Sequence, residues 1–144
     1  MAVESIGLGR IAARLAKQVE RALGDVALSV PQYRVLANLS EGPSAASALA
    51  ERLIVSRPSV TAIADGLVER GLVERRATPA DRRSVIHVLT DRGLEVLASA
   101  DKAIERRLHA LAESLSEAER RRAFGGLQAW QKALDAVRSR AATR

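Results

Sequence analysis

The feature that most constrains the fold is a change of hydrophobic period between residues 44 and 89. Two short amphipathic helices are predicted at 44–53 and 57–70, with a tight connection between them. The pattern then changes to two strand-like segments, 72–76 and 84–89, on either side of a turn-rich basic loop. Two helices, a short turn and a long-tipped hairpin in this order predict a winged helix-turn-helix.

Local signals mark where the second of these helices begins and ends. Ser56 is a favourable N-terminal cap, Pro58 falls in the first turn, and Gly71 suits the left-handed position that often follows a helix. The residues expected to face the core recur at three- and four-residue steps: Val60, Ile63, Ala64, Leu67 and Val68. The opposite face carries small or charged side chains and is therefore predicted to face solvent or a partner.

Further helices are predicted on both sides of this region, at 4–24, 31–41, 91–115 and 117–138. Ser29 with Gln32, and Ser116 with Glu119, form capping-box patterns, and Thr90 can cap the helix after the hairpin. The chain as a whole is therefore predicted to be mainly α with a small β-hairpin.

Two of these helices carry apolar stripes that one small winged domain cannot cover. Residues 4–24 have one stripe, and 94–115 have leucines and an isoleucine at heptad-like spacing, interrupted by Asp101, which we place at the solvated edge. Gly125 and Gly126 inside the last helix predict a kink or the close approach of another helix. Residues 139–144 are expected to fray.

Composition excludes several classes of protein. A chain of 144 residues is of single-domain size, and it has no cysteine, so it is neither a disulfide scaffold nor a thiol enzyme. Its two histidines, His87 and His109, leave little material for a metal site, and we expect no metal and no cofactor. We assign no role to either histidine. With no apolar run of membrane-spanning length and no secretion signal, a cytoplasmic protein is expected.

The charge balance indicates an anionic partner. The formal net charge is +6, and 20 of the 23 basic residues are arginines. A compact domain with this imbalance is a candidate for nucleic-acid binding. Because the only aromatic residues are Tyr33, Phe124 and Trp130, the sequence offers little for stacking on single-stranded bases, and double-stranded DNA is the expected partner.

The candidate DNA contacts gather at the start of helix 57–70 and along the hairpin. A recognition helix places its first turns at base edges in the major groove, where its dipole also favours phosphate, and arginines at a hairpin tip suit a narrow minor groove. The predicted DNA-binding residues are Ser56, Arg57, Pro58, Ser59, Thr61, Ala62, Arg75, Arg76, Arg82 and Arg83. The alternative is a winged-helix module for protein interaction. An enzyme is not expected, since no catalytic constellation is visible.

Several motifs resemble those of one family. Asp81-Arg82-Arg83-Ser84 followed by Leu89-Thr90-Asp91-Arg92-Gly93 is similar to the wing and exit of MarR (multiple antibiotic resistance regulator) proteins. Ser56 to Thr61, and Leu67 to Arg75, are similar to their recognition helix and first wing strand. The resemblance covers roughly residues 5–137. One departure is Ala62, where many members carry arginine, so the base contact of that arginine is expected to be absent, with Arg57 or a preference of Ala62 for the thymine methyl group in its place.

The resemblance implies a ligand-responsive transcriptional repressor that binds a palindromic operator as a homodimer. Residues 1–144 would form one MarR-like domain, with a DNA-binding lobe at 30–89 and dimerisation helices at 4–24 and 91–138. It also implies that Asp65 pairs with Arg83 to hold the wing against the recognition helix. Many members release DNA when a small aromatic or anionic effector binds between the dimer helices and the DNA-binding lobe. The corresponding residues here would be Leu15, Tyr33, Leu36 and Leu97.

Overall fold

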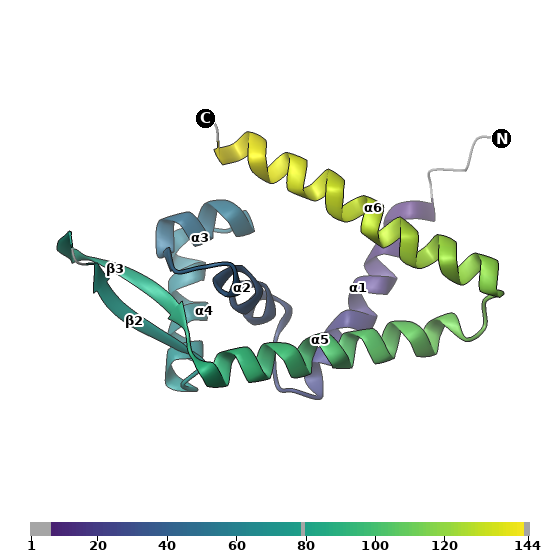
Figure 1. Cartoon of the computed structure of the whole chain (residues 1–144), viewed down its shortest axis with the longest axis horizontal. Coiled ribbons are helices and arrows are strands. Elements are labelled where there is room, and N and C mark those ends of the chain that lie inside the picture. The colour runs from purple at the N-terminus through teal and green to yellow at the C-terminus, as the bar shows by residue number, and fades with distance from the viewer. Residues whose placement is uncertain (1–6, 79, 143–144) are drawn as a thin grey trace. The chain divides into compact units, whose positions relative to one another are not determined.

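The computed structural model describes residues 7–78 and 80–142, apart from the side chains of Arg82, Ala141 and Ala142. Its elements are α1 (Leu8–Gly24), α2 (Val30–Ser40), β1 (Ser44–Ala45), α3 (Ala46–Leu53), α4 (Arg57–Glu69), β2 (Val73–Thr78), β3 (Asp81–Leu89), α5 (Asp91–Ala112) and α6 (Glu117–Ala142) (Figure 1). The prediction of a mainly helical chain with a small hairpin is confirmed. No helix in the described part of the chain is both long and apolar enough to cross a membrane.

The helix starts are held by the predicted caps. The Ser29 N–H donates to Gln32 Oε1 at 3.0 Å, and the Gln32 N–H donates back to Ser29 Oγ at 3.2 Å. Ser116 and Glu119 make the same reciprocal pair of hydrogen bonds. The hydrogen bond from the Ser116 N–H lowers the pKa of the Glu119 carboxyl most, and the Ser116 hydroxyl lowers it further. Each box satisfies amide groups that a helix start would otherwise leave unpaired.

The chain divides into two compact units, residues up to Arg107 and residues from Leu108 onward. The first unit is built around a core in which Leu36 of α2, Leu49 of α3 and Leu67 of α4 are 0% exposed. Each such side chain contributes about 1.5–3 kcal/mol through burial. Because α4 is held to this core by one face, its other face is left outside.

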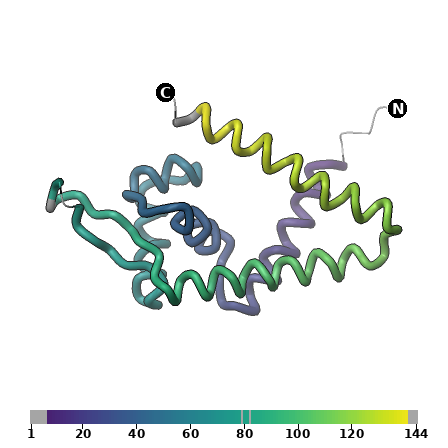
Figure 2. The backbone as a smooth tube through the Cα atoms, in the orientation of Figure 1, coloured from purple at the N-terminus to yellow at the C-terminus, as the bar shows by residue number. Residues whose placement is uncertain are grey.

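The hairpin belongs to a three-stranded antiparallel sheet with β3 in the centre, between β1 and β2. In Figure 2 the backbone leaves α4, runs out along β2, returns along β3 and enters α5. Ser44, predicted to start a helix, lies instead in β1, opposite His87, and is 6% exposed. The reason is that Ser44 and Ala45 pair with the free side of β3, so α3 begins two residues later.

The strands are longer than predicted. Residues 77–83, interpreted as a loop, belong largely to β2 and β3, with an irregular register between Ala77 and Thr78. Thr78 Oγ1 donates to the Asp81 carbonyl at 2.8 Å and accepts the Asp81 N–H at 3.3 Å. These two bonds join the ends of β2 and β3, so the strand pairing continues to Thr78 and Asp81, although the turn-forming residues of this segment predicted a loop.

The last helix is also longer than predicted. α6 continues to Ala142, so 139–142 are helical rather than frayed, while Thr143 and Arg144 lie outside the described residues. Gly125 and Gly126 lie within this single helix, and a Cβ at either would meet nothing within 4 Å.

Candidate nucleic-acid interface

The N-terminal half of α4 has one buried and one exposed face. Val60, Ala64 and Leu67 are each 0% exposed and fix the helix to the core. The side chains predicted to meet DNA all lie on the exposed side: Ser56, Arg57, Pro58, Ser59, Thr61 and Ala62. This places the six residues together on the first turns of one rigid helix, an arrangement that suits insertion into a major groove.

The hydroxyl groups on this turn are already oriented. The Ser56 and Ser59 hydroxyl oxygens are 2.8 Å apart, and the Ser56 Oγ also accepts the Ser59 N–H at 3.3 Å. The Thr61 hydroxyl donates to the Arg57 carbonyl at 3.0 Å. The Thr61 proton is used in this bond, so its oxygen can only accept from a base edge, whereas the serine pair uses one of its two hydroxyl protons and keeps the other for a base edge or a phosphate. The helix dipole adds a partial positive charge at this end.

The wing is joined to the recognition helix by a different ion pair from the expected one. Asp65 on α4 pairs with Arg75 on β2, not with Arg83. β2 follows directly from α4, so Arg75 at its start can face Asp65. Arg83 lies near the hairpin tip, where its N–H donates to Asp81 Oδ1 at 2.9 Å. In the structure Asp65 therefore pairs with Arg75 in place of the predicted Arg83, a contact that the sequence did not reveal.

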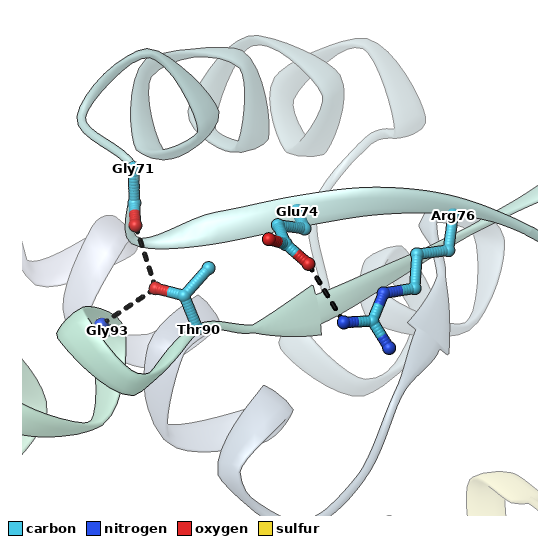
Figure 3. Close-up of polar contacts among 5 residues, drawn as sticks. All are labelled: Gly71, Glu74, Arg76, Thr90 and Gly93. Atoms are coloured by element: carbon cyan, nitrogen blue, oxygen red, sulfur yellow. Dashed lines mark hydrogen bonds and ion pairs between the residues drawn. The ribbon is translucent and has the colours of Figure 1, made fainter.

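Of the other hairpin arginines, Arg76 has an acidic partner on its own strand. Arg76 is exposed and its Nη2 lies 2.9 Å from Glu74 Oε2, two residues earlier on the same strand (Figure 3). Glu74 partly offsets the positive charge that Arg76 would present to DNA, an effect that the sequence analysis did not consider. The side chain of Arg82 lies outside the described part of the chain.

Thr90 connects the end of the recognition helix, the hairpin and α5. Its hydroxyl donates to the Gly71 carbonyl at 2.7 Å and accepts the Gly93 N–H at 3.0 Å (Figure 3). Its own N–H donates to the Leu72 carbonyl at 3.1 Å. A Cβ on Gly93 would lie 2.2 Å from that same Leu72 oxygen. The T-x-x-G pattern is thus explained, because threonine supplies both bonds and glycine permits the close approach.

His87, to which the sequence analysis assigned no role, is buried at the centre of the sheet. Its side chain is 4% exposed, and its Nδ1 has no hydrogen-bond partner among the residues that the structure describes. Burial lowers the pKa of His87, and the positive charge of Arg75 lowers it further, while the Ser44 backbone and Asp65 act in the opposite direction. Burial therefore favours the neutral form of this histidine, which lies opposite Arg75 in the sheet.

The residues proposed for an effector pocket fall into two groups. Leu36 and Leu97 are core residues, 0% and 7% exposed, whereas Leu15 and Tyr33 are half-buried. The Tyr33 hydroxyl donates to Asp101 Oδ1 at 2.6 Å. Burial raises the pKa of Tyr33, and so do this bond and the charges of Asp101 and Glu105. The hydroxyl of the half-buried Tyr33 is thus satisfied by the exposed carboxylate of Asp101 on α5.

Comparison with known proteins identifies the family. Residues 28–84 match the sequence model of the MarR family. Over 120 residues the chain is 31% identical to the HTH-type transcriptional regulator YfiV of Bacillus subtilis, covering 78% of this chain and 75% of that protein. The chain belongs to the MarR family. It is a DNA-binding transcriptional regulator and not an enzyme.

Further relatives place this MarR-family protein among regulators of known structure. It is 33% identical over 97 residues to a Thauera aromatica protein whose name assigns it to transcriptional regulation of the hcr operon; the match spans 67% of this chain but only 58% of that protein's length. The repressor CouR bound to a 23-mer DNA duplex superposes with a TM-score of 0.73 at 31% identity, covering 90% of this chain and 92% of that one.

A second CouR structure contains a small molecule. The structure of CouR from Rhodococcus jostii RHA1 bound to p-coumaroyl-CoA superposes with a TM-score of 0.68 at 25% identity, over 87% of this MarR-family chain and 90% of that chain. The fold of the present protein is thus shared with one CouR structure that contains DNA and with another that contains p-coumaroyl-CoA.

Proposed function

We propose that this regulator is a repressor that binds a palindromic operator as a homodimer and reads it with the first turns of α4. The observation that carries the proposal is the exposed set of Arg57, Ser59 and Thr61 on a helix whose other face is fully buried. An arginine fork suits the O6 and N7 acceptors of guanine, and small hydroxyls suit several base edges. Arg76, Arg82 and Arg83 on the hairpin supply sequence-independent contacts to the DNA backbone.

Exposed apolar side chains support the dimer. Leu8 and Ile11 of α1 are 54% and 58% exposed. On α6 the exposed apolar residues are Leu127, Trp130, Leu134 and Val137, between 42% and 67% exposed. Soluble monomers rarely leave stripes of this kind in water, and a second copy can bury them. In a two-fold dimer the two copies of α4 would meet half-sites about one DNA turn apart.

The effector proposal is supported by the surroundings of Tyr33 and by the CouR complex. Leu36 and Leu97 already fill the core, so an effector would enter beside the half-buried Leu15 and Tyr33. Asp101 and Glu105 place negative charge next to Tyr33, which would repel an anionic group. We therefore expect the aromatic ring of an effector, and not its anionic group, to lie beside Tyr33. Its binding would compete with the bond between Tyr33 and Asp101.

The test begins with selection of bound fragments from the native genome, followed by binding to the selected duplex and to a scrambled one at several salt concentrations. We expect tight binding to the selected duplex, with an affinity that falls steeply as salt rises. Sedimentation should give twice the chain mass of 15.4 kDa at micromolar concentration. Equal affinity for both duplexes would overturn the sequence-specific role, and a monomer would overturn the dimer.

A further inference from the structure

Ile54 combines two features that a stable turn would avoid. It lies between α3 and α4, where its backbone adopts φ 55° and ψ 53°, the left-handed region. Its side chain is 82% exposed, the highest value among the large apolar residues that the structure describes. A β-branched residue is among the least suited to this backbone region, and exposure gives it no packing in return.

The same turn occurs at two other helix ends of this chain. After α3 the Val55 N–H donates to the Ala50 carbonyl at 3.1 Å, after α4 the Leu72 N–H donates to Leu67, and after α1 the Leu28 N–H donates to Leu23. The left-handed residue is Gly71 after α4, with φ 72°, and Ala27 after α1, with φ 53°. The backbone geometry alone therefore favours glycine, and isoleucine at this position is an unfavourable choice for stability.

Because unfavourable backbone conformations cluster at functional sites, an exposed isoleucine in such a conformation is a candidate for a contact outside the folded chain. The position of Ile54 suggests which contact. Ile54 stands two residues before the cap Ser56 and three before Arg57, at the end of α4 that faces the proposed operator. The most exposed large apolar residues otherwise lie on α1 and α6, far along the chain from this turn.

We propose that Ile54 contacts the deoxyribose surface of the DNA backbone at the edge of the major groove, as an apolar anchor beside Arg57. This inference rests on the proposed function. The exposed residues that follow Ile54 include Ser56, Arg57 and Ser59, whose polar and positively charged groups favour DNA over a protein as the partner of this turn. Because Ile54 precedes the helix, it lies beside the groove edge, and its contribution is independent of base sequence.

The test compares two glycine substitutions that relieve the same backbone conformation. Ile54→Gly and the control Ala27→Gly should both raise Tm, by about 3 °C, since each removes a side chain from a left-handed position. Only Ile54→Gly should weaken DNA binding, by about tenfold, and equally on the selected and scrambled duplexes. The slope of log affinity against log salt should not change, because no charge is lost.

A third variant, Ile54→Leu, keeps an apolar side chain and should bind DNA within about twofold of the wild type. Ile54→Gly that is more stable and binds DNA as tightly as the wild type would overturn the proposal. So would loss of binding by Ile54→Leu equal to that of Ile54→Gly, because the turn and not the side chain would then matter. If the wild type binds neither duplex, the proposed function itself fails, and the two failures are thereby distinguished.

Discussion

The carboxylate of Asp65 on α4 accepts a hydrogen bond from the guanidinium of Arg75 on β2 and so joins the recognition helix to the wing. Arg75 lies opposite the buried His87 in the sheet, and Asp65 lies one turn beyond the residues of α4 that are predicted to contact DNA. The two side chains are 38% and 59% exposed, so the pair contributes at most about 1 kcal/mol to stability. We therefore expect its main effect to be on the position of the wing when DNA binds.

The first prediction concerns the coupling between these two residues. Asp65→Ala and Arg75→Ala should each alter operator affinity, and the double variant should add little to the larger single effect, with a coupling of about 0.5–1 kcal/mol. The control cycle pairs Asp65→Ala with Arg83→Ala, which should be additive because those side chains do not pair. The measurement is binding to one operator duplex at fixed salt. Additivity of Asp65 with Arg75 would contradict the positioning role.

The second prediction concerns base reading by Arg57. Replacing Arg57 by alanine should cost about 1–3 kcal/mol on the operator if its fork binds a guanine. The loss on a scrambled duplex should be much smaller, because base contacts specify the site. Binding to both duplexes at one salt concentration measures this. An equal loss on both would show that Arg57 binds phosphate instead.

A buried residue of the same helix provides the control for Arg57. Val60 is 0% exposed and faces the core. Val60→Ala should lower thermal stability, and it should affect binding to all DNA alike. A Val60→Ala variant with wild-type Tm and altered sequence preference would mean that the two faces of α4 have been assigned wrongly.

The third prediction concerns the close approach at Gly93. Gly93→Ala should destabilise the protein by about 3 kcal/mol or more, because its Cβ would lie 2.2 Å from the Leu72 carbonyl oxygen, a backbone atom held by Thr90. Gly24→Ala at the end of α1 is the control, since a Cβ there meets nothing within 4 Å. That change should stabilise by up to about 1 kcal/mol. Denaturant unfolding measures both, and equal effects would refute the steric explanation.

Much of this fold was predictable because its signals are local. Capping at Ser29, Ser56 and Ser116, and glycine at position 71, depend on neighbours within a few residues, and the structure contains all four. The two faces of α4 follow from helical periodicity for the same reason. Composition and charge then indicated DNA, and the family comparison confirmed a DNA-binding regulator.

The errors concern partners that are distant in sequence. Ser44 became a strand residue because β3, more than 40 residues later, offers an unpaired side. Asp65 pairs with Arg75 because the direction of β2 after α4 decides which arginine it meets, and the order of residues does not reveal that direction. His87 could be recognised as buried only once β1 and β2 were seen to flank β3.

The last prediction concerns pH and follows from the burial of His87. Because burial lowers its pKa in the folded state, the unfolded chain binds a proton first as pH falls below the ordinary value of about 6.5. Linkage then requires that stability be fully present above that pH and be lost as pH falls toward the lowered folded pKa. Protonation would also place a second positive charge beside Arg75. The free energy of unfolding should therefore decrease across this acidic window.

Replacing His87 by glutamine should remove that contribution, because glutamine has no proton to gain. The variant will have a different stability at neutral pH, so the quantity to compare is the change in unfolding free energy between about pH 7 and pH 5, measured by denaturant titration. His109→Gln, which retains His87, should keep the wild-type loss. If His87→Gln loses as much stability as the wild type over this range, the buried imidazole is not the cause of the acid destabilisation. Carboxylates elsewhere in the chain would then be responsible.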